Sequence, residues 1–238
     1  MAKVVIFSGA GISAESGIST FRDNDGLWDK YDVKKIATKG ALENNRAETI
    51  EFYDKRRLDL KDKKPNKAHQ TIVELKHKYP DDIAIITQNV DDLFEKAGAK
   101  PDEVLHLHGF MTKVECESCG LTYDIGYKKQ NEAFNGKCPK CFSSKIRPHI
   151  VMFGELAPMY ENFRLELYDC EMFVVIGTSG NVIVVDGIAS QAKFSILNNL
   201  EKSEMIDDSV FDKVYYEPAT TAISKIQKDI EEFLQNSK

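Results

Sequence analysis

The chain has 238 residues, of which 42% are hydrophobic and 29% charged, and this composition is typical of a globular protein with one large domain. Its net charge of -6 at pH 7 argues against a protein that binds nucleic acid through a basic surface. No run approaches the roughly 20 apolar residues of a membrane span, and Ser8, Gly9 and Gly11 interrupt the apolar N-terminus, so it does not resemble a signal peptide. We therefore expect a cytoplasmic protein whose five cysteines are not paired in disulfides.

Short apolar runs alternate with longer stretches of helical pattern, which favours an α/β fold. Within the run Val4–Ser8, the residues from Val4 to Phe7 are all apolar, as expected for a central strand that helices cover on both faces. The C-terminal stretch 220–235 carries a helical stripe of apolar residues that would pack on the sheet. In chain order, the expected strands are Val4–Ser8, Ile83–Thr87, Val104–His106 and 173–177, with others around Ile196 and Val214. The expected helices are 41–60, Lys67–Lys78, 91–97, 160–169 and 220–235.

The segment 112–148 is rich in cysteine, glycine, lysine and asparagine, and it has too few aliphatic residues to form a core of its own. It contains the pattern C-x2-C-x18-C-x2-C, formed by Cys116, Cys119, Cys138 and Cys141. Two such pairs supply four thiolates for a tetrahedral Zn²⁺ with no open coordination position. Four unrelated thiols or a redox pair are the alternatives, and the doubled spacing disfavours both. We predict one structural zinc ion in a small inserted module.

A glycine-rich turn, Gly9-Ala10-Gly11, follows the first expected strand. Such a turn lets backbone amides approach a phosphate, and the N-terminus of a following helix would favour its negative charge. By itself Gly-Ala-Gly is weak evidence, because many turns of this kind are simply tight.

The longer block GAGISAESGISTFRD, residues 9–23, followed by Gly26-Leu27-Trp28, resembles the NAD-binding signature of the sirtuin family. Further blocks occur in the family's order: TQNVD at 87–91, HLHG at 106–109, the four cysteines, VMFGE at 151–155, GTS at 177–179 and NLE at 199–201. The resemblance covers essentially the whole chain. It implies a Rossmann-like parallel sheet domain from residues 1–30, 70–112 and 149–238. Residues 31–69 would form the helical part of a small domain, and residues 113–148 its zinc-binding module.

The same resemblance implies an NAD-dependent protein-lysine deacylase, in which the acyl oxygen attacks the ribose carbon as nicotinamide leaves. His108 would be the general base, which takes a proton from the ribose hydroxyl that then attacks the imidate carbon. His106 is a rival by pattern alone, and the glycine after His108 matches the family's His-Gly. Asn89 is the second expected catalytic residue, orienting ribose hydroxyls together with Gln88. Asp91 would accept a hydrogen bond from the nicotinamide carboxamide.

Further contacts with NAD and with the peptide follow from the resemblance. Phe21 would shield the ribose from water, and Arg22 would bind a phosphate. The loop 151–155 would pair with the substrate peptide by strand addition. The residues expected to bind NAD are Gly9, Ala10, Gly11, Phe21, Arg22, Gln88, Asn89, Asp91, Gly177, Thr178, Ser179, Asn199 and Ala219. Those expected to bind the acylated substrate are Tyr53, Arg56, Val151, Phe153, Gly154 and Glu155.

Two residues bear on which acyl group is removed, Tyr53 and Arg56. They are three residues apart and share a helix face. This Tyr-x-x-Arg resembles the pair with which sirtuin desuccinylases bind an acyl carboxylate, and Ala37 matches a small residue that widens their acyl pocket. The alternative is that Lys55, Arg56 and Arg57 form a solvated basic face. We expect removal of succinyl and malonyl groups from protein lysines, and of acetyl as well. A plain deacetylase, a long-chain deacylase, an ADP-ribosyltransferase and a non-enzymatic NAD sensor remain alternatives.

Overall fold

The computed structural model describes residues 3–20 and 32–236. Six strands of this described chain form the main sheet: β1 (Val4–Ser8), β2 (Ile83–Thr87), β3 (Val104–His106), β7 (Met172–Ile176), β8 (Phe194–Asn199) and β9 (Lys213–Tyr216). They pair in parallel in the order β3-β2-β1-β7-β8-β9. Since the chain leaves β1 towards one edge and later returns to its other side, the sheet is doubly wound. Its switch point lies between the carboxyl ends of β1 and β7.

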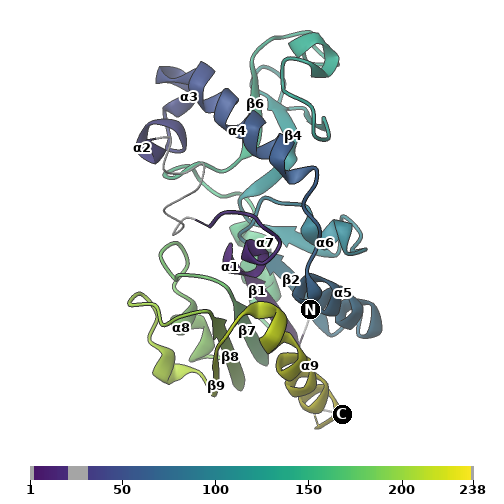
Figure 1. Ribbon diagram of the computed structural model, residues 1–238, viewed down its shortest axis with the longest axis vertical. Coiled ribbons are helices and arrows are strands. Elements are labelled where there is room, and N and C mark those ends of the chain that lie inside the picture. Colours follow the sequence, from purple (N-terminus) through teal and green to yellow (C-terminus); the bar gives the residue numbers. More distant parts are fainter. Residues whose placement is uncertain (1–2, 21–31, 237–238) are drawn as a thin grey trace.

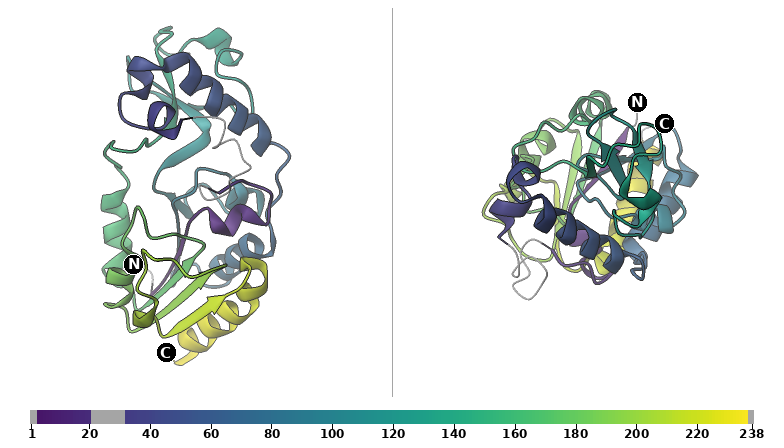
Figure 2. Two further views of the ribbon diagram at one scale, coloured as in Figure 1. Left: turned by 60° about the vertical axis from the view of Figure 1, so that its left-hand side comes forward. Right: turned by 90° about the horizontal axis from the view of Figure 1, so that it is seen from above.

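Helices cover both faces of this sheet (Figures 1 and 2). In chain order, the α-helices of the described residues are α1 (Gly11–Ala14), α2 (Val33–Ile36), α3 (Ala41–Asn44), α4 (Arg46–Leu60), α5 (Lys67–Lys78), α6 (Leu93–Lys96), α7 (Tyr160–Leu167), α8 (Val185–Ala189) and α9 (Ala219–Asn236). Helices α5, α6 and α9 pack on Val4 and Ile6, whereas α7 and α8 pack on Val5 and Phe7. Successive side chains of a strand point to opposite faces, so β1 contributes to two cores. Among the described residues, no helix combines the length and the apolarity that crossing a bilayer requires.

A smaller part of the protein stands beyond the carboxyl ends of the main sheet and lies at the top of Figure 1. It combines α2, α3 and α4 with an antiparallel sheet of β4 (Gly109–Cys116), β5 (Thr122–Asp124) and β6 (Ile146–Ile150), in the order β5-β4-β6. Phe52 and Tyr53 of α4 share a core with Met111 of β4. The structure thus has the predicted architecture, a Rossmann-like parallel sheet with a small cysteine-containing insertion.

Several predicted elements have the observed bounds, namely Val4–Ser8, Ile83–Thr87, Val104–His106 and Lys67–Lys78. The others differ at their ends: the strand expected at 173–177 lies one residue earlier, and the helix expected at 160–169 ends at Leu167. The helix expected at 91–97 is limited to α6. Asp91 precedes that helix, with its Oδ1 accepting from the backbone N–H of Leu93 at 3.2 Å.

The prediction of a single helix over 41–60 was wrong, because the chain leaves the helical conformation at Asn45. Asn45 has φ -137° and ψ 38°, and its Nδ2 donates to the carbonyl oxygen of Lys35 at 3.3 Å. Asparagine side chains compete with the helix for backbone hydrogen bonds, which explains the interruption. Strands β4, β5 and β6 and the short helices α1, α2 and α8 were not predicted. The short strands of the insertion carry little apolar periodicity, so their pairing depends on tertiary contacts.

The four cysteines of the insertion come together at one point. Their Sγ atoms lie within 4.8 Å of one another, with Cys116 and Cys141 3.5 Å apart and Cys119 and Cys138 3.7 Å apart. A tetrahedral zinc with Zn–S bonds of about 2.3 Å places its sulfurs about 3.8 Å apart. The backbone N–H of Lys140 also points to Cys138 Sγ at 3.4 Å, which stabilises a thiolate. The donor set therefore fits one structural zinc ion with four protein ligands.

A buried ion pair within α4 makes the hydrogen bonds that link this helix to β4 and to the insertion. Arg57 is completely buried, its guanidinium pairs with Asp54, and its Nε donates to the carbonyl oxygen of Met111 at 2.8 Å. Asp54 also accepts from the backbone N–H of Gln130 at 3.0 Å, and Gln130 Nε2 donates to the carbonyl oxygen of Ile146 at 2.9 Å. These contacts connect the helix that carries Tyr53 and Arg56 to the segment between the two cysteine pairs.

Replacing Cys138 by Ser should release the zinc and lower the thermal midpoint, because metal-binding energy in such a module is folding energy. Metal analysis of protein purified without chelator should give about one zinc per wild-type chain and clearly less for the variant. Cys170→Ser, outside the cluster, serves as the control and should keep its zinc. Wild-type protein with far less than one zinc per chain would contradict the assignment.

Replacing Asp54 by Ala should lower the free energy of unfolding by about 3–5 kcal/mol, because the buried guanidinium of Arg57 loses its counter-ion. Urea unfolding followed by circular dichroism measures the change. Glu51→Ala is the matched control, since it removes a carboxylate on the same helix that pairs with the exposed Lys55 and should have little effect. Equal effects of the two replacements would show that the buried pair does not hold the two parts together.

Candidate functional site

A cavity of about 990 Å³ opens at the carboxyl ends of the central strands and extends towards α4. The crevice beyond the switch point of a doubly wound sheet is where such folds bind ligands. Every described residue that the sequence analysis assigned to NAD or to the acylated substrate lines this cavity: Gly9, Ala10, Gly11, Tyr53, Arg56, Gln88, Asn89, Asp91, His108, Val151, Phe153, Gly154, Glu155, Gly177, Thr178, Ser179, Asn199 and Ala219. Phe21, Arg22 and Trp28 lie outside the described residues.

The two glycine turns at the switch point touch each other through their backbones. A Cβ atom on Gly9 would lie 2.7 Å from the carbonyl oxygen of Gly177, and one on Gly11 would lie 2.6 Å from Gly177 Cα. Gly177 has φ +66°, and a Cβ there would lie 2.4 Å from the backbone nitrogen of Ile12. The glycines are therefore needed for packing as well as for access of a ligand to the backbone. The helix α1 that follows is only one turn long.

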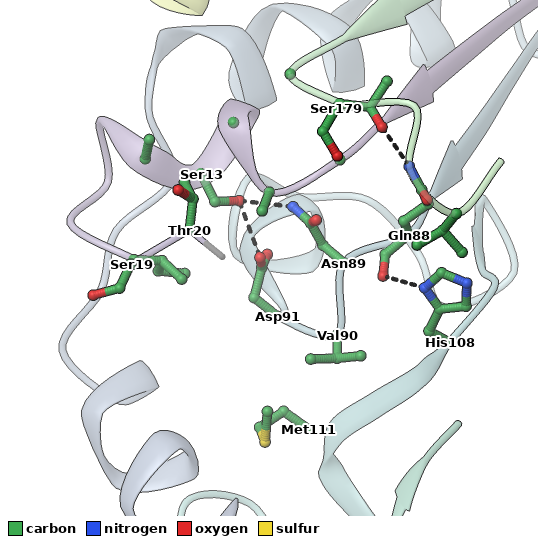
Figure 3. A pocket seen from close by; sticks show the side chains of 18 of the residues that line it. Ser13, Ser19, Thr20, Gln88, Asn89, Val90, Asp91, His108, Met111 and Ser179 are labelled. Atoms are coloured by element: carbon green, nitrogen blue, oxygen red, sulfur yellow. Dashed lines mark hydrogen bonds between the residues drawn. The ribbon is translucent and has the colours of Figure 1, made fainter. Parts of the chain in front are cut away.

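Ser13 connects two of the predicted site residues, as Figure 3 shows. Its Oγ donates to Asp91 Oδ2 at 3.0 Å and accepts from Asn89 Nδ2 at 3.1 Å. Ser13 Oγ also lies 3.4 Å from Nε2 of the buried His69, and burial lowers the pKa of His69 to about 3, so this imidazole is neutral near pH 7. Burial likewise raises the pKa of Asp91 above its usual value. The hydrogen bonds of Ser13 fix the orientation of the Asn89 amide and of the Asp91 carboxyl group.

Sequence reasoning gave no role in the site to Ser13 or to His69. Ser13 lies inside the quoted block GAGIS and could have been selected as the first hydroxyl after the glycine turn. His69 lies in the first turn of the amphipathic helix α5, where it forms a capping box with Asn66. Its proximity to Ser13 arises only when α5 packs against the sheet.

His108 lies at the cavity wall with both ring nitrogens engaged. Nδ1 is 3.1 Å from the carbonyl oxygen of Gln88, and Nε2 is 3.0 Å from the hydroxyl of Tyr160. Because a carbonyl oxygen can only accept, Nδ1 carries the proton and Nε2 of the neutral ring is an acceptor. Burial lowers the pKa of His108, which favours this neutral form.

The rival histidine, His106, occupies a different place. Its Nδ1 lies 2.9 Å from the carbonyl oxygen of Asn89, and its Nε2 lies 3.0 Å from Glu95 Oε1. It lines a neighbouring cleft instead of the cavity that contains His108. In this position His106 supports the backbone at Asn89, while His108 is accessible to a ligand.

Asn199 and Ala219 lie at the end of the cavity formed by the carboxyl end of β8 and the start of α9. The side chain of Asn199 is buried, and its Nδ2 has no hydrogen-bond partner among the described residues. A buried amide donor without a partner costs free energy, and a ligand oxygen would satisfy it. The ribose and phosphate oxygens of NAD supply acceptors of this kind, so the residues fit the dinucleotide.

Tyr53 and Arg56 border the cavity from α4, together with the buried Ala37. Burial raises the pKa of Tyr53 to about 12, so its phenol stays a neutral donor, and burial also lowers the pKa of Arg56. The guanidinium of Arg56 lies over the ring of Phe52, at 5.7 Å from its centroid. The neighbouring Arg57 is buried away from solvent, so the basic run does not form one solvated face.

The loop 151–155 lines the cavity beside His108. The backbone N–H of Val151 donates to His108 at 2.9 Å, and that of Phe153 donates to Ala37 at 2.9 Å, each to a carbonyl oxygen. The carboxylate of Glu155 accepts from Arg147 at 2.8 and 2.9 Å and from the backbone N–H of Met152 at 3.0 Å. Glu155 therefore braces the loop.

Comparison with known proteins agrees with this geometry. The model of the Sir2 family matches residues 9–184, which is more than half of the chain. An NAD-dependent protein deacylase of Campylobacter jejuni is 45% identical over 236 residues, covering 99% of both chains. A Sir2 homologue solved in complex with NAD is 31% identical, with a TM-score of 0.82, covering 98% of this chain and 91% of that one. Sir2Tm bound to a propionylated peptide is 26% identical, with a TM-score of 0.75, covering 95% and 92% of the two chains.

The family match, the near-complete coverage by relatives and the shared fold lead to one assignment. This chain belongs to the Sir2 family.

Proposed function

We propose that this NAD-dependent protein deacylase prefers lysines that carry an acidic acyl group, such as succinyl or malonyl, and also acts on acetyl-lysine. The observation that carries the proposal is the position of Tyr53 and Arg56 at the wall of the same cavity as His108. A guanidinium and a phenol together offer up to three hydrogen bonds to a carboxylate, two of them charge-assisted. Arg56 is half-buried, and the loss of hydration that lowers the pKa of its guanidinium makes a bound anion more favourable.

The remaining residues of the cavity support NAD binding in defined roles. The turn from Gly9 to Gly11 would hold the pyrophosphate, and Asn199 would donate to the adenosine ribose. Asp91 would accept from the nicotinamide carboxamide, in an orientation that Ser13 fixes. NAD supplies the electrophilic ribose carbon that the acyl oxygen attacks. The acylated peptide is the other substrate, consistent with the propionylated peptide bound by the related Sir2Tm.

His108 is the general base of this proposal. Its unprotonated Nε2 and its lowered pKa keep it able to accept a proton at neutral pH. Asn89 would orient the ribose hydroxyls while its side chain is held by Ser13. A protein ADP-ribosyltransferase would use the same NAD site, but it would need neither an acyl pocket nor a pair that fits a carboxylate.

The double replacement Tyr53→Phe with Arg56→Met should strongly reduce kcat/KM for succinyl-lysine peptides and spare that for acetyl-lysine peptides. In the wild type, kcat/KM should be higher for the succinyl peptide than for the acetyl peptide, by up to about 10⁴-fold. A site built to bond a polar group can reject by this factor an analogue that lacks the group. Mass-spectrometric assays with acetyl-, succinyl- and fatty-acyl-lysine peptides measure both. Lys55→Met is the control, since it removes a positive charge from the exposed face of the same helix. Equal wild-type kcat/KM for succinyl and acetyl peptides would rule out the preference and leave a general deacetylase.

The replacement His108→Ala should lower the rate of acyl transfer by about 10²–10⁴, the usual contribution of a general base. NAD binding, measured by calorimetry, should remain, because the imidazole is not needed to hold the dinucleotide. Nicotinamide should be released only when acyl-peptide is present in the wild type. If His106→Ala abolished acyl transfer and His108→Ala did not, the base would be misassigned.

A further inference from the structure

The hydroxyl of Tyr160 lies 3.0 Å from Nε2 of His108, and both residues line the cavity. Tyr160 is the first residue of α7 and belongs to none of the motifs found in the sequence, yet its side chain lines the cavity that contains the predicted NAD and acyl-lysine contacts. The two rings are 6.0 Å apart between centroids and tilted by 49°, so the hydroxyl and not the ring face meets the imidazole.

The hydrogen-bond pattern fixes the direction of this contact. Nδ1 of His108 carries the proton that it donates to the carbonyl oxygen of Gln88, so the neutral ring can only accept at Nε2. Tyr160 therefore donates its O–H to the single lone pair of that nitrogen. Burial raises the pKa of Tyr160 and lowers that of His108, and both effects favour the neutral pair.

Tyr160 is half-buried, and contacts with the core and with the start of α7 hold it in this position. Its side chain packs with Met159 and Leu167 against the core between α7 and the main sheet. Its backbone N–H donates to the carbonyl oxygen of Ala157 at 3.2 Å, at the entry to the helix. Displacing the ring would expose apolar surface and break the contact with His108. A substrate hydroxyl that needs Nε2 therefore meets the oxygen of Tyr160 first.

We propose that Tyr160 is a second catalytic residue, through whose hydroxyl His108 receives the proton of the ribose hydroxyl. The phenolic oxygen has lone pairs that can accept from the ribose while its own proton points to the imidazole. In the transfer the ribose O–H bond breaks and a bond forms from that proton to the Tyr160 oxygen. At the same time the original Tyr160 O–H bond breaks and an Nε2–H bond forms. The ribose oxygen keeps its electron pair and attacks the imidate carbon, whose C=N π electrons move onto the nitrogen. The proposal rests on the proposed role of His108 as the base.

The variant Tyr160→Phe tests the relay, because it removes one oxygen and keeps the ring. Two rates are measured with the full-length protein and an acyl-lysine peptide: incorporation of labelled nicotinamide into NAD, which precedes proton removal, and formation of the O-acyl-ADP-ribose product. Product formation should fall by at least about 10-fold, and by up to the roughly 10²–10⁴-fold that proton-transfer catalysis contributes. Nicotinamide exchange and NAD binding should be retained. Tyr168→Phe, at the exposed C-terminal end of α7, is the matched control and should change neither rate.

The double variant His108→Ala with Tyr160→Phe separates the possible outcomes. Residues that act as one unit are non-additive, so the double variant should be no slower in product formation than His108→Ala alone. If the loss of product formation in the double variant equalled the product of the two single-variant losses, the relay would be overturned. A parallel loss of nicotinamide exchange in Tyr160→Phe would also overturn it, because that result indicates a structural role. Unchanged or faster product formation in Tyr160→Phe would show that the hydroxyl only blocks Nε2. If instead His108→Ala kept full product formation, the base assignment itself would fail, a result distinct from failure of the relay.

Discussion

The close backbone contact between the turns after β1 and β7 is the constraint on which the site depends. Gly9 and Gly11 approach Gly177 so closely that a Cβ on either would overlap its backbone atoms. This contact forms at the switch point of the sheet, where the connections that follow β1 and β7 leave in opposite directions and open a crevice. Ser13 follows the first turn directly and is thereby brought to Asn89 and Asp91, which follow β2.

A second connection runs from the cysteine cluster to the acyl end of the cavity. The cluster holds an insertion that has only a small core of its own, and the insertion in turn contacts α4 through Asp54, Arg57 and Gln130. Tyr53 and Arg56 lie on that helix, on its cavity side. The proposed recognition of an acyl carboxylate therefore depends on a structural zinc site that contributes none of its cysteines to the cavity.

The two histidines of the HLHG block show how closely spaced residues take different roles. In an extended strand, residues two apart point to the same face. Strand β3, however, ends at His106, and β4 begins at Gly109, so the chain changes direction between the two histidines. His106 contacts Asn89 and Glu95, whereas His108 contacts Gln88 and Tyr160. Pattern alone left the two equal, and the direction of the chain separates them.

The sequence by itself determined the fold class, the central strands and the four-cysteine cluster, because these depend on local composition and spacing. The unbroken apolar runs of β1 and β7 indicated burial on both faces, and the doubled C-x-x-C indicated a tetrahedral site. Only the tertiary structure decided the break at Asn45, the contact of Ser13 with His69 and the contact of Tyr160 with His108. Ser13 and His69 are 56 residues apart, and His108 and Tyr160 are 52 residues apart. Such contacts leave no periodic trace in the sequence, since they form only when helices dock on the sheet.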